Sequence, residues 1–291
     1  MKTTTKLREL IKSKELIVAP GAFSPLCAKM IQKVGFNCVY MSGYGVAAYR
    51  LGFPDVGLMT MNESLDTARA IAQACDLPVI ADVDNGYGNV INVKRTVEEY
   101  ELAGVAGIQL EDQSWPKRCG HMEGKVLISA EEMVQKIRIA VASRKDPDFV
   151  IVARTDANTV LGFDEAIRRS NLYAEAGADI IFFESPTSDE QVEKIPDLVH
   201  APVMLNMSEG AKTPLRNNAE IRSLGYKLVI WPPSATWAAA RAIQEIYQIL
   251  KDKGTTGEDL EKLILFHEFN DLIGLPEVMR LSDEYKTGTT Y

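Results

Sequence analysis

The stretch Val79-Ile-Ala-Asp82-Val-Asp84-Asn-Gly-Tyr-Gly88 joins a short apolar run to two carboxylates and a turn. A short, continuous run rich in Val and Ile is typical of a parallel strand that is buried on both faces. Asp82 and Asp84 lie two residues apart, so their side chains point to the same face of that strand. This stretch therefore predicts a buried strand that ends in a pair of carboxylates.

Seven further apolar runs repeat this pattern along the chain. The eight runs are Leu16–Ala19, Cys38–Met41, Val79–Val83, Gly107–Leu110, Phe149–Ala153, Ile180–Phe183, Val203–Leu205 and Leu228–Ile230. Between them lie helical patterns, clearest in Ser64–Ala74, Val93–Ala103, Ala130–Ser143, Asp164–Ala176 and Ala235–Leu250. Glycines at the ends of several helices allow the left-handed turn into the next strand.

Eight strand–helix units in roughly 250 residues are typical of an α/β protein with the (β/α)₈ TIM-barrel fold. A doubly wound open sheet is the alternative, but it rarely uses eight evenly spaced strands. No linker or low-complexity tract divides the chain. We therefore expect a single barrel domain over residues 1–291, in which residues 255–291 form a carboxyl-terminal helical extension.

The composition is that of a globular protein, with 46% hydrophobic and 25% charged residues among 291. A formal net charge of −8 argues against nucleic acid or an anionic membrane surface as the main partner. The amino terminus lacks a signal-peptide core, and no stretch approaches the ~20 apolar residues of a membrane span. The four cysteines form no Cys-x-x-Cys pair, which favours a cytoplasmic protein with reduced thiols.

Polar side chains follow six consecutive strands of the predicted barrel, strands two to seven. In this fold the active site lies at the carboxyl ends of the strands. The residues found there are Ser42, Asp82 with Asp84, Glu111 with Asp112, Arg154, Glu184 and Asn206. One or two polar strand ends would be unremarkable, since every strand meets water somewhere. Six in succession that are able to bind a metal or a carboxylate predict a functional site.

Asp82, Asp84 and Glu111 are candidate metal ligands. Like charges that are buried together repel, and a cation relieves that repulsion. An all-oxygen site without histidine suits Mg²⁺, with Mn²⁺ as an alternative, and waters and substrate oxygens would complete the octahedron. The other interpretation is that Asp84-Asn-Gly is a turn capped by its aspartate.

A long polar connection after strand four contains Lys117-Arg118-Cys119-Gly120-His121. Loops of this length in compact domains are often functional. We expect the neighbouring cations to lower the pKa of the Cys119 thiol, and Gly120 to admit a ligand close to the backbone. The alternatives are an inert loop cysteine and a solvated basic patch made by Lys117 and Arg118.

A second long connection follows strand two, from Ser42-Gly43-Tyr44-Gly45 to Asp55. Its small residues could let backbone N–H groups hold a carboxylate. Asp55 is either a group of the active site or the start of a turn.

Several segments together resemble the isocitrate lyase/phosphoenolpyruvate mutase superfamily, over nearly the whole chain. The most specific segments are Ser42-Gly-Tyr-Gly, Pro54-Asp-Val-Gly, Asp82-Val-Asp-Asn-Gly-Tyr-Gly, Gln109-Leu-Glu-Asp-Gln, Lys117-Arg-Cys-Gly-His and Val152-Ala-Arg-Thr-Asp. The resemblance implies a barrel whose eighth helix is exchanged between subunits, in a homotetramer built as a dimer of helix-swapped dimers. An apolar face in the carboxyl-terminal extension could serve that exchange or could cover the subunit's own barrel.

The resemblance also implies roles for individual residues. Mg²⁺ would lie near Asp82, Asp84 and Glu111. The residues expected to bind the substrate, a small carboxylate, are Ser42, Gly43, Tyr44, Gly120, Arg154, Glu184 and Asn206. Those expected to take part in catalysis are Cys119, Lys117, Asp55 and His121.

Within this superfamily, the Lys-[Arg/Lys]-Cys-Gly-His pattern resembles that of lyases, whereas phosphoenolpyruvate mutases and phosphonopyruvate hydrolases generally lack the cysteine. The chain length and the residues of the motifs look closest to lyases that act on 2-methylisocitrate or 2,3-dimethylmalate, and Tyr44 favours the latter. We therefore expect a Mg²⁺-dependent carbon–carbon lyase that cleaves a 2-hydroxy di- or tricarboxylate to pyruvate and a carboxylic acid.

Other functions remain open from the residues. Oxaloacetate hydrolysis uses nearly the same site. A phosphonate-handling mutase, of the phosphoenolpyruvate mutase or carboxyvinyl-carboxyphosphonate phosphorylmutase type, would not need Cys119. The alternative that is not an enzyme is a catalytically silent binding protein. The intact acidic triad and Cys119 argue against it, since a silent descendant could have lost either.

Overall fold

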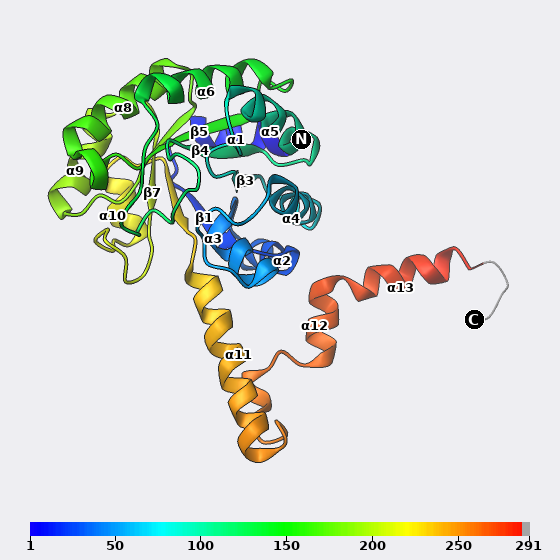
Figure 1. The fold of residues 1–291 in the computed structure, drawn as a ribbon. Coiled ribbons are helices and arrows are strands. Elements are labelled where there is room, and N and C mark those ends of the chain that lie inside the picture. The colour runs from blue at the N-terminus through cyan, green and yellow to red at the C-terminus, as the bar shows by residue number, and fades with distance from the viewer. Residues whose placement is uncertain (287–291) are drawn as a thin grey trace. The chain divides into compact units, whose positions relative to one another are not determined.

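The computed structural model describes residues 1–286. Eight parallel strands close into a barrel in sequence order, with β8 paired to β1 (Figure 1). The strands are β1 Ile17–Ala22, β2 Val39–Met41, β3 Val79–Asp82, β4 Gly107–Glu111, β5 Val150–Thr155, β6 Ile180–Phe183, β7 Val203–Asn206 and β8 Leu228–Trp231. Every predicted apolar run overlaps one strand, so the predicted TIM barrel is confirmed.

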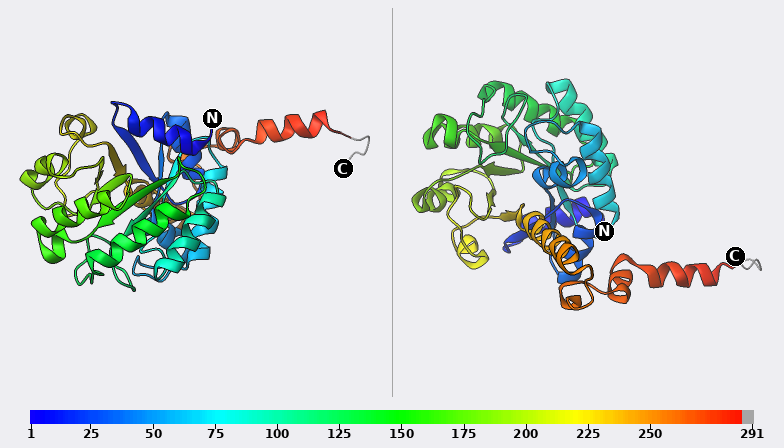
Figure 2. Two further views of the ribbon diagram at one scale, coloured as in Figure 1. Left: turned by 90° about the horizontal axis from the view of Figure 1, so that it is seen from above. Right: turned by 60° about the horizontal axis from the view of Figure 1, so that its bottom comes forward.

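Helices surround the barrel (Figures 1 and 2). Those of the barrel portion are α1 Thr3–Lys12, α2 Pro25–Val34, α3 Gly43–Val46, η1 Ala47–Leu51, α4 Met61–Gln73, α5 Val90–Leu102, α6 Ala130–Ser143, α7 Asn158–Leu161, α8 Phe163–Glu175, α9 Asp189–Leu198 and α10 Asn218–Ser223. Then follow α11 Ser234–Lys253, η2 Leu260–Lys262, α12 Phe266–Ile273 and α13 Leu275–Glu284. None of these helices has both the length and the apolar content that crossing a bilayer requires, within residues 1–286.

Two helices begin three residues earlier than their apolar periodicity indicates. Thr60 and Glu63 form a reciprocal capping box at the start of α4, and Asn89 and Asn92 do the same at α5. The side chains of such a box satisfy backbone N–H groups that the first turn leaves unpaired. Polar caps therefore set these helix starts.

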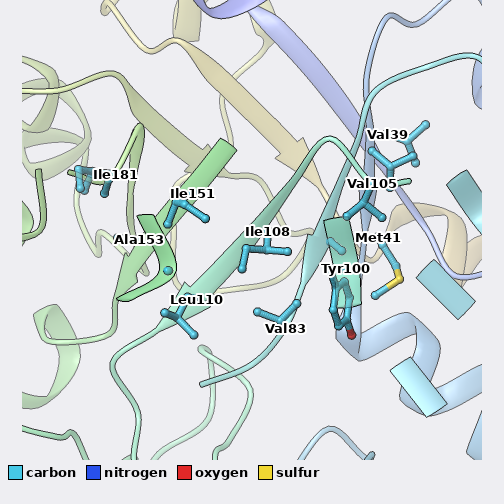
Figure 3. Close-up of a cluster of buried hydrophobic side chains, with 14 of the residues drawn as sticks. Val39, Met41, Val83, Tyr100, Val105, Ile108, Leu110, Ile151, Ala153 and Ile181 are labelled. Atoms are coloured by element: carbon cyan, nitrogen blue, oxygen red, sulfur yellow. The ribbon is translucent and has the colours of Figure 1, made fainter. Parts of the chain in front are cut away.

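The barrel strands send alternate side chains to two apolar cores. In β5, Ile151 and Ala153 belong to the core between the barrel and its helices (Figure 3). Val150 and Val152 belong to a second core, to which Leu7 of α1 also belongs. Because side chains alternate along a strand, this second core is the barrel interior.

The α1 helix closes the amino-terminal end of the barrel. Leu7 is fully buried in the interior core. Arg8 donates to Asp179 Oδ1 at 2.6 Å and to the carbonyl oxygens of Asp148 and Phe149 at 3.0 Å each. The end of the barrel opposite to the predicted active site is therefore closed by apolar packing and by ion pairs.

The chain divides into two compact units, Met1–Thr236 and the part that starts at Trp237. This boundary lies before residue 255, where the sequence analysis places the start of the extension. The second unit exposes many large apolar side chains, among them Ile264, Phe266, Phe269 and Ile273. Helix exchange between subunits and a homotetramer stay predictions.

Candidate active site

The predicted site residues continue the inward-facing series of the strands. Two positions beyond an apolar residue of the barrel interior, the chain places a polar one: Tyr40 leads to Ser42, Ile80 to Asp82, Val152 to Arg154, Phe182 to Glu184 and Met204 to Asn206. Since side chains repeat every two residues, these groups point into the carboxyl-terminal mouth of the barrel. The fold thus gathers the strand-end residues that the sequence analysis selected.

One side of this mouth is dominated by carboxylates, and we call it the acidic half. It consists of Asp55, Asp82, Asp84, Glu111 and Lys117, all of them buried. Lys117 Nζ lies 2.5 Å from Asp55 Oδ1 and 2.7 Å from Asp84 Oδ1. The alternative that placed Lys117 in a solvated patch is therefore wrong, whereas Arg118 is exposed and its guanidinium donates to the Glu123 carbonyl oxygen.

Burial controls the ionisation of the acidic half. Desolvation raises the pKa of Asp84 to about 7, although the Lys117 ammonium opposes this rise. Desolvation also raises the pKa values of Asp82 and Glu111, against the opposing effects of Lys117 and Arg154. Full ionisation of these carboxylates would therefore place more negative charge in the acidic half than the nearby cations can stabilise.

The Asp84-Asn-Gly segment is both a turn and a part of the site. Asp84 has a φ of 50°, and its carbonyl oxygen accepts from the Glu111 N–H at 2.9 Å. Its carboxylate points to Lys117 and does not serve only to cap the turn. A left-handed non-glycine residue is strained, and such strain is common at functional sites.

The loop after β2 lies directly on this acidic half. A Cβ atom at Gly43 would stand 2.8 Å from Asp82 Oδ2, so glycine is required for the close approach. The Ser42 hydroxyl accepts from the Gly45 N–H at 3.2 Å, which leaves its hydrogen to be donated to a ligand. Tyr44 follows in α3 and is half-buried.

Two interior residues that the sequence analysis missed support Asp82. Gln109 Nε2 donates to Asp82 Oδ1 at 3.3 Å, and the Tyr40 hydroxyl donates to Gln109 Oε1. Both residues lie inside strands that read as apolar runs. The sequence did contain a signal for them. Both fall on inward-facing positions of their strands, where a buried polar side chain requires a hydrogen-bond partner.

The other side of the mouth pairs its charges, and we call it the paired half. It consists of Lys125, Arg154, Asp156, Glu184, His121 and Asn206. Arg154 donates from Nε and Nη2 to the two oxygens of Asp156, at 2.8 and 3.0 Å, and stacks on the Phe182 ring at 5.0 Å. Arg154 and Lys125 together hold the pKa of Asp156 at about 2, against the effect of its burial.

This pairing limits how Arg154 can hold a substrate. Its bidentate contact, which a substrate carboxylate would otherwise occupy, is made here with Asp156. Nη1 of Arg154 is directed to Glu184 Oε2 at 3.7 Å, so this nitrogen faces the site. Asp156 lies in the quoted Val152-Ala-Arg-Thr-Asp motif, two residues after Arg154, and that spacing was the overlooked signal.

Asp112 supports the paired half from outside the barrel. It was counted among groups able to bind a ligand, but its carboxylate accepts from Thr155 Oγ1, Asp156 N, Arg169 Nη1 and Tyr173 OH. Asp112 follows inward-facing Glu111, so its side chain points to the opposite face. It is a structural anchor for the end of β5.

The Cys119 loop lies against both halves. The Cys119 N–H donates to the Asp55 carbonyl oxygen at 3.1 Å. A Cβ atom at Gly120 would stand 2.7 Å from Cδ of Glu184. His121 Nε2 lies 3.7 Å from Glu184 Oε1 and 3.4 Å from Asn206 Nδ2. The structure therefore brings these three loop residues next to the strand ends.

The expected direction of the Cys119 pKa is wrong. Burial raises the pKa of this thiol to about 11, and the nearby Asp55 carboxylate adds to the rise. Lys117 and Arg154 lower it by less. The group is therefore held as a thiol, which is the form that donates a proton.

Comparison with known families and proteins gives concordant matches. The phosphoenolpyruvate phosphomutase family matches residues 7–251. A 2,3-dimethylmalate lyase of Eubacterium barkeri is 50% identical over 288 residues, which cover 99% of this chain and 100% of that protein. A 2-methylisocitrate lyase of Aeropyrum pernix is 46% identical over 268 residues, or 92% of this chain and 86% of that protein.

Solved structures match along nearly the whole chain as well. An oxaloacetate acetylhydrolase in complex with 3,3-difluorooxalacetate has a TM-score of 0.92 and 36% identity, covering 97% of each chain. A phosphonopyruvate hydrolase in complex with oxalate and Mg²⁺ has a TM-score of 0.89 and 32% identity, covering 98% of this chain and 99% of the other.

Proposed function

The chain belongs to the phosphoenolpyruvate mutase/isocitrate lyase superfamily, and from that premise we propose that it is a Mg²⁺-dependent carbon–carbon lyase. Its substrate is a 2-hydroxy dicarboxylate of the 2,3-dimethylmalate type, with a 2-methylisocitrate-type tricarboxylate as the second candidate. The products are pyruvate and a carboxylic acid. The observation that carries this proposal is the Cys119 thiol, which is held protonated at the junction of the two halves.

A divalent cation fits the acidic half. Within residues 1–286, neither carboxylate oxygen of Glu111 has a hydrogen-bond donor, although both are buried. No three His, Cys, Asp or Glu side chains in that range converge closely enough to enclose an ion by themselves. Mg²⁺ is usually bound by one or two carboxylates and keeps several waters, so such convergence is not required. Asp82, Asp84 and Glu111 would hold the ion, or Mn²⁺ in its place, partly through water.

When bound, the cation would polarise the substrate's hydroxyl oxygen and stabilise it as it becomes a carbonyl oxygen. The chain's own residues hold the rest of the 2-oxo acid portion. Ser42 donates its hydroxyl hydrogen and Arg154 its Nη1–H to the adjacent carboxylate. Asp156 fixes the guanidinium plane, so this donor is in place before the substrate arrives.

The hydroxyl proton passes to a basic group of the site as the carbon–carbon bond breaks and its electron pair leaves with the second fragment. That fragment is then an aci-carboxylate, whose carbon must receive a proton. Cys119 supplies that proton from its thiol, since burial keeps the proton on sulfur at neutral pH. Glu184, His121 and Asn206 lie beside the Cys119 loop and would contact this fragment. Lys117 remains between Asp55 and Asp84, where it limits the negative charge of the acidic half.

The proposal is tested by coupling pyruvate release to lactate dehydrogenase. The protein is supplied with Mg²⁺ and with 2,3-dimethylmalate or 2-methylisocitrate in parallel reactions. Pyruvate from either compound, abolished by EDTA and restored by excess Mg²⁺, is the expected result. Absence of pyruvate from both would contradict the proposal.

Oxaloacetate hydrolysis is the second candidate function. It is favoured by the structural similarity to oxaloacetate acetylhydrolase at a TM-score of 0.92. Oxalate and acetate, measured after incubation with oxaloacetate and Mg²⁺, distinguish this activity from the lyase reaction. A phosphonate mutase is less favoured, because its chemistry gives the Cys119 thiol no role.

For the assembly we propose a homotetramer of helix-swapped dimers in the cytoplasm. The exposed apolar side chains of α12 and α13, such as Phe266 and Val278, support burial of these helices in an assembly. Light scattering that gives the mass of one chain would contradict it.

A further inference from the structure

Ser185 lies directly behind the site and contacts three of its groups. Its hydroxyl is 2.7 Å from Glu184 Oε1, 3.3 Å from His121 Nδ1 and 3.4 Å from the Gly120 carbonyl oxygen. Ser185 is fully buried. It therefore joins the end of β6 to the loop that carries Cys119.

The contacts of Ser185 determine which nitrogen of His121 carries the hydrogen. The Glu184 carboxylate accepts hydrogen bonds only, and the Arg154 guanidinium holds its pKa below the ordinary value despite burial. The shortest contact thus takes the single Ser185 hydroxyl hydrogen. Its oxygen can then offer only lone pairs to His121, so Nδ1 must be the donor.

The opposite side of the imidazole agrees with this assignment. Asn206 Nδ2 has two hydrogens, and it donates one to Glu184 Oε2 at 3.3 Å. The second is directed to His121 Nε2 at 3.4 Å, which requires a lone pair on Nε2. Both neighbours therefore favour the tautomer with hydrogen on Nδ1.

The backbone of Ser185 adopts a strained conformation that a neighbouring side chain stabilises. Its φ is 54°, a left-handed conformation that a non-glycine residue rarely adopts. Asn158 Nδ2 donates to the Ser185 carbonyl oxygen at 2.6 Å and fixes the strained peptide. Glycine would relieve the strain but could not make the hydroxyl contacts. A serine at this position is thus explained by its side chain.

We propose that Ser185 is a positioning residue that fixes His121 as the Nδ1–H tautomer and presents Nε2 as a hydrogen-bond acceptor beside Glu184 and Asn206. This inference rests on the proposed function, since it concerns the part of the site that receives the second fragment. Without the hydroxyl, Nε2–H can donate to Glu184 Oε1 and the imidazole reverses its polarity.

The test measures the tautomer directly, without substrate. Selective ¹⁵N-histidine labelling and long-range ¹H–¹⁵N correlation distinguish a protonated from an unprotonated ring nitrogen, and the chain has three histidines. Wild type should show hydrogen on Nδ1 of His121, and Ser185→Ala should shift it toward Nε2. Wild type with hydrogen on Nε2, or Ser185→Ala with an unchanged tautomer, would overturn the proposal.

Kinetics of the same variants separate positioning from backbone strain. Ser185→Ala should lower kcat about tenfold to a hundredfold, as when a partner that orients a functional imidazole is removed. Ser185→Gly relieves the strain yet should be as impaired, whereas Ser185→Thr keeps the hydroxyl and should retain the Nδ1–H tautomer. Full activity in Ser185→Gly would overturn the proposal.

Ser170→Ala is the matched control, because within residues 1–286 its buried hydroxyl bonds only the Ala166 carbonyl oxygen of its own helix. It should match wild type in tautomer and kcat. If the wild-type protein releases no pyruvate, the lyase proposal fails, but the tautomer measurement still decides the role of Ser185.

Discussion

The carboxylates of the acidic half and those of the paired half are equally buried but ionise in opposite ways. Burial raises the pKa values of Asp82, Asp84 and Glu111 in the acidic half. In the paired half, the pKa values of Asp156 and Glu184 are lowered although these groups are just as buried. For Asp156, the difference from the acidic half lies in the number of cations that contact the carboxylate.

Asp156 is contacted by both Arg154 and Lys125, whereas Asp84 shares the single ammonium of Lys117 with Asp55. A carboxylate with two close cations remains ionised without further help. A group of carboxylates that share one cation needs another positive charge. This contrast explains why we assign the metal ion to one half of the site and the substrate carboxylate to the other.

The largest effect is expected from removing the group that lies between the two halves. Cys119→Ala should lower turnover by roughly 10²–10⁴-fold, because the carbanion loses its general acid. Mg²⁺ binding, measured by calorimetry, should stay near the wild-type value, since neither half loses a charge. Cys75→Ala, a half-buried cysteine outside the site, is the control. Near-wild-type turnover by Cys119→Ala would refute the proposed role of the thiol.

A smaller effect, restricted to Mg²⁺ binding, should follow from a substitution in the acidic half. Asp84→Asn removes one carboxylate and leaves the side-chain volume nearly unchanged. The Mg²⁺ concentration for half-maximal activity should rise about tenfold to a hundredfold, a range typical of weakened metal sites. An unchanged Mg²⁺ requirement in this variant would remove the acidic half from the metal site.

The corresponding change in the paired half should affect the substrate and not the metal. Asp156→Asn releases the guanidinium of Arg154 from its bidentate contact, so KM should rise by about tenfold, or 1.4 kcal/mol. The Mg²⁺ requirement should be unchanged. Asp189→Asn, which breaks an exposed ion pair with Arg216, is the control and should leave both KM and the Mg²⁺ requirement unchanged. A Mg²⁺ effect of Asp156→Asn would show that the two halves are not separate.

The smallest effect concerns the stability of the metal-free protein. The folded state holds a proton on Asp84 up to a pH of about 7, compared with an ordinary pKa of 3.8. This contribution is present at low pH and is lost as the pH rises from about 4 to 7, because the unfolded chain releases the proton earlier. The Tm of the metal-free protein should therefore fall by a few degrees over this interval.

The same decline should be smaller in Asp84→Asn and should be offset by Mg²⁺ in wild type, since a ligand that binds only the folded state stabilises it. Thermal denaturation at several pH values, with EDTA or with Mg²⁺, measures both effects. A metal-free Tm that falls between pH 4 and 7 as steeply in Asp84→Asn as in wild type would contradict this role of Asp84.

The barrel was predictable because its strands are short apolar runs that differ from the amphipathic helices between them. The strand-end residues were predictable for a related reason. Each polar residue keeps the two-residue alternation of its strand, so Asp82 and Glu184 had to face the same interior as Ile80 and Phe182. For these residues, local spacing determined the position in space.

The groups that sequence reasoning missed depend on contacts between distant segments. Lys125 reaches Asp156 from another loop, and Ser185 reaches His121 across 64 positions of the chain. The pKa of Cys119 was predicted in the wrong direction for the same reason. Neighbouring Lys117 and Arg118 were visible in the sequence, but the burial that outweighs their charge comes from packing of the whole loop.

The most direct test of the contrast between the two halves is a crystal structure of the protein soaked with Mn²⁺, measured at a wavelength where manganese scatters anomalously. We expect one anomalous peak in the barrel mouth, among Asp82, Asp84 and Glu111. A peak beside Asp156 and Glu184, or no peak in the mouth at a saturating Mn²⁺ concentration, would contradict the assignment of the metal to the acidic half.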